Sequence, residues 1–211
     1  MNYTEFAKDV HENAKAHGWW EDDRDFGEIV ALCHSEISEA LEEFRAARPN
    51  LWWDCFLSLS VDNVARPDQC EKCAYNGRSP SCAKSHGKPE GIAVELADCV
   101  IRIFDWFGKM NLDADELLRE TKGGERWMEG MPIYKVNSFG SLMAHLHRNL
   151  SAAYDHDCNA DGVRKTALYM AVCCNEIFDW AQSQGVDLDE ILRIKHEYNK
   201  TREYKHGGKV I

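Results

Sequence analysis

HSEISEALEEFR, residues 34–45, is a short helical stretch that places glutamates where a hydrophobic core is expected. At 100° per residue, Glu36 shares the apolar face of the helix with Ile29, Cys33, Ile37, Ala40 and Phe44. Glu39 and Glu43 flank this face, and only Glu42 points to the polar side. A carboxylate in a core costs free energy unless a partner compensates its charge. Another part of the chain should therefore supply a partner for these glutamates.

A second acidic pair lies in PEGIAVELADCVIRIFDW, residues 89–106, which is apolar around almost its whole circumference. The exception is one stripe, formed by Glu95, Asp98, Arg102 and Asp105. The members of each acidic pair are three residues apart, so Glu36 and Glu39 share one helical face, as do Glu95 and Asp98. Antiparallel packing of the two helices would bring the four carboxylates together.

Four clustered carboxylates cannot all remain ionised, because each charge raises the pKa of its neighbours. A hard divalent cation resolves this conflict, and all-oxygen ligation favours Mg²⁺ or Mn²⁺ over Zn²⁺. Two other interpretations are solvated surface acids, some paired with Arg45 or Arg102, and a di-iron centre. A di-iron bundle needs Glu-x-x-His on two helices, and this spacing occurs once, from Glu203 to His206. We therefore favour a Mg²⁺ or Mn²⁺ site.

The composition limits the class of protein. The chain has 211 residues and a formal charge of −11, whereas a nucleic-acid-binding surface needs clustered Lys and Arg. The sequence contains no run of 18 apolar residues, so we expect no membrane span. The N-terminus lacks the apolar segment of a signal peptide. We therefore expect a cytoplasmic protein with no nucleic-acid or membrane partner.

Helical periodicity dominates the chain, and no stretch alternates convincingly as a strand does. The sequence predicts an all-α helical bundle. The expected helices cover residues 3–17, 25–47, 89–109, 113–126, 138–156, 161–184 and 187–203. Residues 48–88 are rich in Cys, Ser, Pro and Gly and are predicted to be an irregular insertion.

The chain also repeats itself, which divides it into residues 1–130 and 131–211. FGEIVALCHSEISEALEEF from Phe26 resembles FGSLMAHLHRNLSAAYDHD from Phe139, and IFDWFGKMNLDADELLR matches IFDWAQSQGVDLDEILR without a gap. The four acids are not repeated. The residues aligned with Glu36, Glu39, Glu95 and Asp98 are Asn149, Ala152, Tyr169 and Val172. We therefore predict a working first half and a degenerate second half.

Three blocks of the sequence carry a family resemblance. They read GWWEDDRDFGEIVALCHSEISEALEEFR, KPEGIAVELADCVIRIFDW and DLDEILRIKHEYNKTREYKHGGKVI, and the match covers about 18–47, 87–118 and 187–211. These blocks resemble the MazG-like nucleotide pyrophosphohydrolases, which belong with the dimeric dUTPases to the all-α NTP pyrophosphatases. The resemblance implies Mg²⁺-dependent hydrolysis of a nucleoside triphosphate between its α and β phosphates, giving the monophosphate and pyrophosphate.

The resemblance also implies roles for particular residues. The catalytic metal ligands would be Glu36, Glu39, Glu95 and Asp98. Glu39 would also orient or deprotonate the attacking water. The substrate-binding residues would be Lys195, Asn199, Arg202 and Trp20, with Trp19 or Trp20 stacking on a base. The alternative interpretation is that Lys195 and Arg202 are solvated residues near a helix C-terminus, where basic residues are favoured, and that both tryptophans belong to the core.

The chain departs from the family pattern in two places. The insertion at 48–88 is longer than the usual connection, and the KHEYNKTR block follows the second half instead of the first. Either the second half carries this substrate-binding tail back to the metal site, giving a pseudo-dimer in one chain, or a homodimer completes the site. The alternative function is a non-catalytic nucleotide- or protein-binding bundle that keeps its metal site.

The insertion contains a possible structural zinc site. Its ligands would be Cys70, Cys73, Cys82 and His86, spaced C-x₂-C-x₈-C-x₃-H, with Cys55 as a possible substitute. The other interpretation is a loop with reduced thiols. The remaining cysteines lie in expected helices and are predicted to be core residues, namely Cys33, Cys99, Cys158, Cys173 and Cys174.

Overall fold

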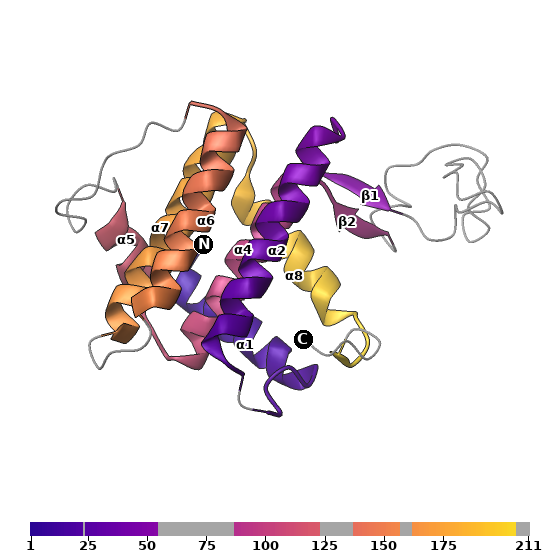
Figure 1. The fold of residues 1–211 in the computed structure, drawn as a ribbon. Helices are drawn as coiled ribbons and strands as arrows, with labels where there is room; N and C mark the ends of the chain where they lie inside the picture. Colours follow the sequence, from indigo (N-terminus) through magenta and orange to yellow (C-terminus); the bar gives the residue numbers. More distant parts are fainter. Residues whose placement is uncertain (23, 55–86, 123–136, 157–161, 206–211) are drawn as a thin grey trace.

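The computed structural model describes residues 1–22, 24–54, 87–122, 137–156 and 162–205. These residues are mostly helical, with one small hairpin (Figure 1). The helices are α1 (Tyr3–Ala16), α2 (Phe26–Arg45), α4 (Ile92–Lys109), α5 (Ala114–Thr121), α6 (Phe139–His156), α7 (Gly162–Ser183) and α8 (Leu188–Lys200). The predicted all-α class is therefore confirmed in its broad outline.

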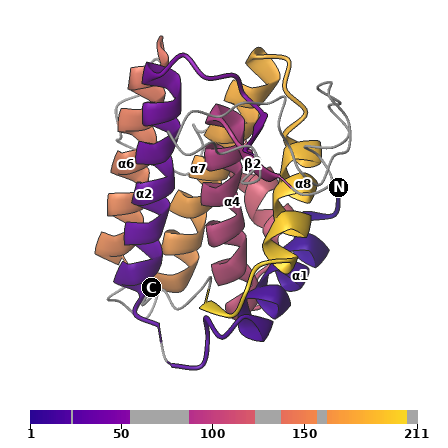
Figure 2. The same ribbon diagram turned by 90° about the vertical axis from the view of Figure 1, so that its right-hand side faces the viewer.

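The helices are arranged in layers (Figure 2). α2 and α6 lie side by side in an outer layer, and α4 and α7 lie in the middle. α1 and α8 cover the other side of α4, and α5 packs on α7. Because α4 is covered on both sides, nearly all of its residues are buried. In the stripe that contains the acids, Glu95 is buried, whereas Asp98, Arg102 and Asp105 are half-buried.

A hairpin of β1 (Trp52–Asp54) and β2 (Lys88–Glu90) corrects the sequence analysis in two respects. The sequence predicts no strand, and it begins a helix near Pro89, which lies in β2; α4 begins at Ile92. Strands of three residues are too short to show an alternating pattern. Gly91 separates strand from helix with a φ of 121°, and a Cβ there would lie 2.6 Å from a backbone oxygen.

In each half of the predicted repeat, the last helix packs on the other half. α2 packs on α4, and α6 packs on α7 in the same way. α5 follows α4 but packs on α7, whereas α8 follows α7 but packs on α4. Asp113 and Asp187 cap α5 and α8 alike, because each side chain accepts a hydrogen bond from the backbone N–H three residues later. This exchange brings α8 to the acidic stripe of α4.

Hydrophobic side chains from all seven described helices form a common core. Four cysteines predicted to be core residues are buried, namely Cys33, Cys99, Cys173 and Cys174. Cys55, Cys158 and the predicted zinc ligands Cys70, Cys73, Cys82 and His86 lie outside the described residues. None of the helices in the described ranges is long and apolar enough to cross a membrane.

Candidate metal centre

Three of the predicted ligands meet between α2 and α4. Oxygen atoms from the carboxylates of Glu36, Glu39 and Glu95 all lie within 4.8 Å of one another. Glu36 is 4% exposed and Glu95 is 3% exposed, whereas Glu39 is exposed to solvent. The burial of Glu36 confirms its position on the apolar face of the helix. These three groups could hold a metal ion, and Glu39 leaves the cluster open to solvent.

The fourth predicted ligand, Asp98, has a partner of its own. Its Oδ2 atom lies 2.8 Å from Nζ of Lys195, which comes from α8 and is 1% exposed. Nζ of Lys195 also donates a hydrogen bond to the carbonyl oxygen of Pro89, at 3.5 Å. Removing one member of a buried ion pair leaves the other charge without compensation. The packing of α8 on α4 therefore depends on this pair. Lys195 therefore reaches the predicted site within the same chain.

Arg102 is the second cation on the cluster, and its contact shows how the two halves differ. Its Nε atom donates a hydrogen bond to Oε1 of Glu36 at 2.6 Å. At the aligned positions of the second half, Asn149 donates to Glu176 at 3.5 Å. Tyr169, which aligns with Glu95, is buried and stacks on the ring of His156. The second half thus has an amide and a tyrosine at two of the carboxylate positions, and it has a carboxylate, Glu176, at the position of Arg102.

The carboxylates of the cluster are difficult to ionise together. Burial raises the pKa of Glu36 to about 7, although the guanidinium of Arg102 opposes this rise. Burial and a hydrogen bond with Glu90 raise the pKa of Glu95 to about 9, against the effect of Lys195. A bound divalent cation would favour the ionised carboxylates and remove this conflict. The donor set is therefore suited to a hard cation.

A cavity of about 150 Å³ opens beside these carboxylates. All four predicted metal ligands line it. Four basic side chains line the same cavity, namely Lys88, Arg102, Lys195 and Arg202. Carboxylates could bind a cation here, while the basic groups attract an anion such as a phosphate. Lys195 and Arg202, two of the predicted substrate contacts, are therefore beside the predicted metal ligands.

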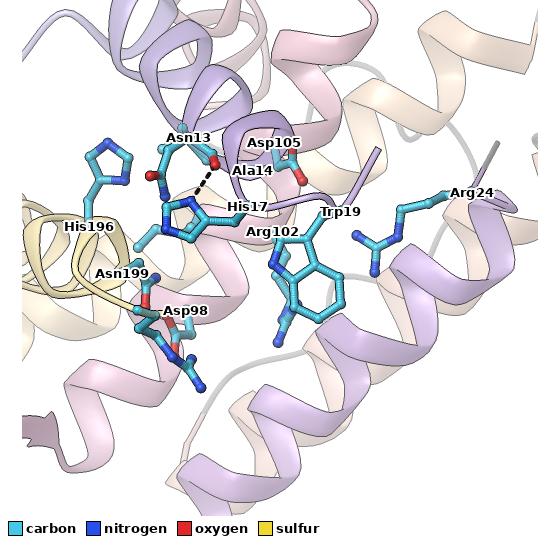
Figure 3. A pocket seen from close by; sticks show the side chains of 13 residues that line it. Asn13, Ala14, His17, Trp19, Arg24, Asp98, Arg102, Asp105, His196 and Asn199 are labelled. Carbon is cyan, nitrogen blue, oxygen red and sulfur yellow. Dashed lines mark hydrogen bonds between the residues drawn. The ribbon is translucent and has the colours of Figure 1, made fainter. Parts of the chain in front are cut away.

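A second cavity, of about 80 Å³, lies between α1, α4 and α8 (Figure 3). It shares Trp19, Asp98, Arg102 and Arg202 with the first cavity, and Asn199 also lines it. Trp20 is not among the residues that line either cavity, and its Nε1 atom donates a hydrogen bond to Oδ1 of Asp105 at 2.9 Å. Of the two tryptophans considered for base stacking, Trp19 is the one beside the site.

Three residues of this region escaped the sequence analysis. Lys88 lines the first cavity, and Glu90 forms an ion pair with Lys88 and a hydrogen bond with Glu95. His196 lines the second cavity and is bound to Asp9 of α1. Lys88 and Glu90 belong to a strand too short to recognise, although both stand in the KPEG block. The contact of His196 depends on packing between the two ends of the chain.

In comparisons with known proteins, no protein-family model, curated protein or solved structure matches this chain. The function must therefore be inferred from the chemistry of the two cavities and from the sequence motifs.

Proposed function

We propose that this protein is a Mg²⁺-dependent nucleoside triphosphate pyrophosphohydrolase, which releases pyrophosphate and leaves a nucleoside monophosphate. One observation carries the proposal. Three carboxylates whose oxygens lie within 4.8 Å of one another share a cavity with four basic side chains. A triphosphate complexed with a divalent cation needs both kinds of group, because the carboxylates bind the metal and the cations bind phosphate oxygens.

The donor set fits Mg²⁺ or Mn²⁺ better than Zn²⁺. Every candidate ligand is a carboxylate oxygen, and thiolates and imidazoles are absent from the lining of this cavity as the described residues define it. Glu36, Glu39 and Glu95 would hold the ion, and Asp98 would join them if its pairing with Lys195 were relaxed. The metal would neutralise phosphate oxygens and lower the pKa of the attacking water.

The protein side chains would prepare the substrate for an in-line attack. Lys195 and Arg202 would bind oxygens of the triphosphate, and Arg102 would hold the carboxylate of Glu36 in place. Glu39 is exposed and belongs to the carboxylate cluster, so it is the group best placed to orient or deprotonate water. Trp19 forms a wall shared by both cavities.

The arrangement of the helices supports one site per chain. Residues of the first half supply the carboxylates, and α8 of the second half supplies Lys195. At the aligned positions the second half has Asn149 and Tyr169, which are buried among other side chains. We therefore propose an internal pseudo-dimer with one working half, which is one of the two arrangements that the position of the KHEYNKTR block leaves open.

Pyrophosphate release from a panel of NTPs and dNTPs with Mg²⁺ tests the proposal. Glu36→Gln should reduce turnover about a hundredfold or more, since it removes a ligand charge while keeping the side-chain volume. Glu42→Gln is the matched control, because Glu42 lies on the exposed face of the same helix and pairs with Arg45 on the surface. Its turnover should equal that of the wild type. Mg²⁺-dependent nucleotide binding without turnover would instead establish a non-catalytic nucleotide-binding bundle.

A further inference from the structure

A third cavity, of about 600 Å³, lies where the C-terminal ends of α2 and α7 meet the N-terminal end of α6. As the described residues define it, this cavity shares no lining residue with the two cavities of the metal centre. Its volume is typical of sites for small organic molecules. The ring of Phe139 stacks on that of Phe44, with centroids 4.5 Å apart, and its centroid lies 5.5 Å from that of Trp180. We call this space the aromatic cavity.

The first half of the chain contains the same aromatic pair, but there it is covered. Phe26 and Trp106 align with Phe139 and Trp180, and their ring centroids are 5.1 Å apart. Trp106 is 4% exposed, whereas Trp180 is half-buried and lines the aromatic cavity. The repeat thus shows that this helical arrangement can close over the pair. The open pair of the second half is therefore not a requirement of the fold.

The aspartate before each tryptophan differs in the same way. In the first half, Asp105 binds Nδ1 of His11 at 2.8 Å and accepts a hydrogen bond from Nε1 of Trp20 at 2.9 Å. Asp179 has the aligned position, is exposed and lines the aromatic cavity. Among the described residues, no hydrogen bond or ion pair involves its side chain. The second half thus keeps the carboxylate without the donors that bind it in the first half.

The charges around the aromatic cavity favour a cationic ligand. Asp179 and Glu176 line it, and the described lining contains no Lys, Arg or His. Both acids lie toward the C-terminal end of α7, where the helix dipole is negative and the last turn has no basic residue. Nδ1 of His145 lies 3.4 Å from Glu176, so Asp179 is the carboxylate left for a ligand. The N-terminal end of α6 is capped, because the hydroxyl of Ser138 accepts the backbone N–H of Ser141.

Aromatic rings beside a carboxylate are suited to an organic cation. The face of an aromatic ring carries negative charge and attracts an ammonium or guanidinium group, most strongly at tryptophan. Leu142 and Ile92 add apolar surface to the lining, so the cavity also suits a hydrocarbon body. An anionic ligand would meet two carboxylates without a compensating cation in the described lining. The ligand therefore combines a positive charge with an apolar portion.

We propose that the aromatic cavity binds an organic cation, namely an amine or guanidinium joined to an apolar body. The rings of Phe44 and Trp180 contact the body and the charged group, and Asp179 pairs with the charge. This site lies outside the metal centre, and the inference does not depend on the proposed function.

An NMR titration with phenethylammonium tests the proposal, and phenethyl alcohol is the neutral probe of nearly the same shape. The reporter is the indole N–H signal of Trp180, which Trp180→Phe identifies by removing it. Mg²⁺ is present throughout, so that the carboxylates of the metal centre do not capture the amine. The variants are Asp179→Asn and Phe44→Leu. The matched control is Asp155→Asn, because Asp155 is exposed on α6 and does not line the cavity.

Phenethylammonium should shift the Trp180 signal saturably, with a Kd of about 1 mM, and should bind about fivefold more tightly than the alcohol. Asp179→Asn and Phe44→Leu should each weaken binding about threefold, whereas Asp155→Asn should bind as the wild type does. The other indole signals should keep their positions, which shows that each variant is folded.

Equal affinity for the ammonium and the alcohol would overturn the assignment of a cation, as would an equal loss in Asp155→Asn and Asp179→Asn. A Trp180 signal that neither probe shifts would overturn the site itself. A Trp180 signal that instead shifts with protein concentration alone would also overturn the proposal, and it would assign the aromatic cavity to contact with a second copy of this chain.

Discussion

Metal affinity should depend steeply on pH, because the metal-free cluster retains protons that a metal must displace. Burial and the hydrogen bond with Glu90 raise the pKa of Glu95 to about 9, and burial raises that of Glu36 to about 7. Metal ligands bind as ionised carboxylates, so each proton must leave when the ion enters. Raising the pH from 7 to 8 should therefore strengthen binding of Mg²⁺ or Mn²⁺.

The size of the effect follows from the ionised fractions. With a pKa of about 9, Glu95 is about 1% ionised at pH 7 and about 9% at pH 8, which gives about a ninefold gain in affinity. Glu36 goes from about one half to about nine tenths ionised, which adds about a twofold gain. Together they predict a gain of about fifteen- to twentyfold, or about 1.7 kcal/mol.

Isothermal titration of Mn²⁺ at the two pH values measures this change, and buffers of different ionisation enthalpy count the protons released. Glu95→Gln should leave only the twofold part, while Glu42→Gln on the exposed face of α2 should keep the full dependence. An affinity that is equal at pH 7 and pH 8 in the wild type would refute the reasoning. It would mean that the nearby cations already keep both carboxylates ionised.

Two further predictions concern stability. Lys195→Met leaves the carboxylate of Asp98 without its cation, so urea unfolding should show a free energy of unfolding about 3 kcal/mol lower. An unchanged free energy of unfolding would contradict the coupling of this pair. His34 and His147 are stacked, with Nδ1 atoms 2.6 Å apart, and burial lowers both pKa values below 6.5. Below about pH 6.5 the unfolded chain therefore binds protons that the folded pair resists, so the free energy of unfolding should fall as the pH drops. Urea titrations from pH 7 to 5 should show a smaller fall for His147→Leu. An equal dependence of the unfolding free energy on pH in variant and wild type would contradict this prediction.

Local helical geometry explains why part of the site was predictable. Residues three or four apart share a helical face whatever lies elsewhere in the chain, so the periodic pattern placed Glu36 on a buried face correctly. The same geometry put Phe44 on the apolar face, yet it is 50% exposed. Phe44 lies one residue before the end of α2 and stacks on Phe139, where the core no longer covers the helix.

The remaining contacts of the site depend on distant parts of the chain. No periodicity in α4 shows that Lys195 will pair with Asp98, because that contact requires α8 to cross from the second half to the first. The sequence offered this crossing as one of two possibilities, beside a second subunit. Glu90 escaped notice because its strand has three residues, so its hydrogen bond with Glu95 carries no sequence signal.

The bond between His196 and Asp9 joins residues 187 positions apart and holds α8 against α1. During synthesis on the ribosome, α1, α2 and α4 emerge long before α8 does. At that stage the chain already contains Glu36, Glu39 and Glu95, but Lys195, His196 and Asn199 have not yet been synthesised. A chain released before residue 188 therefore contains the three clustered carboxylates but lacks all of α8, and with it one wall of both cavities of the metal centre.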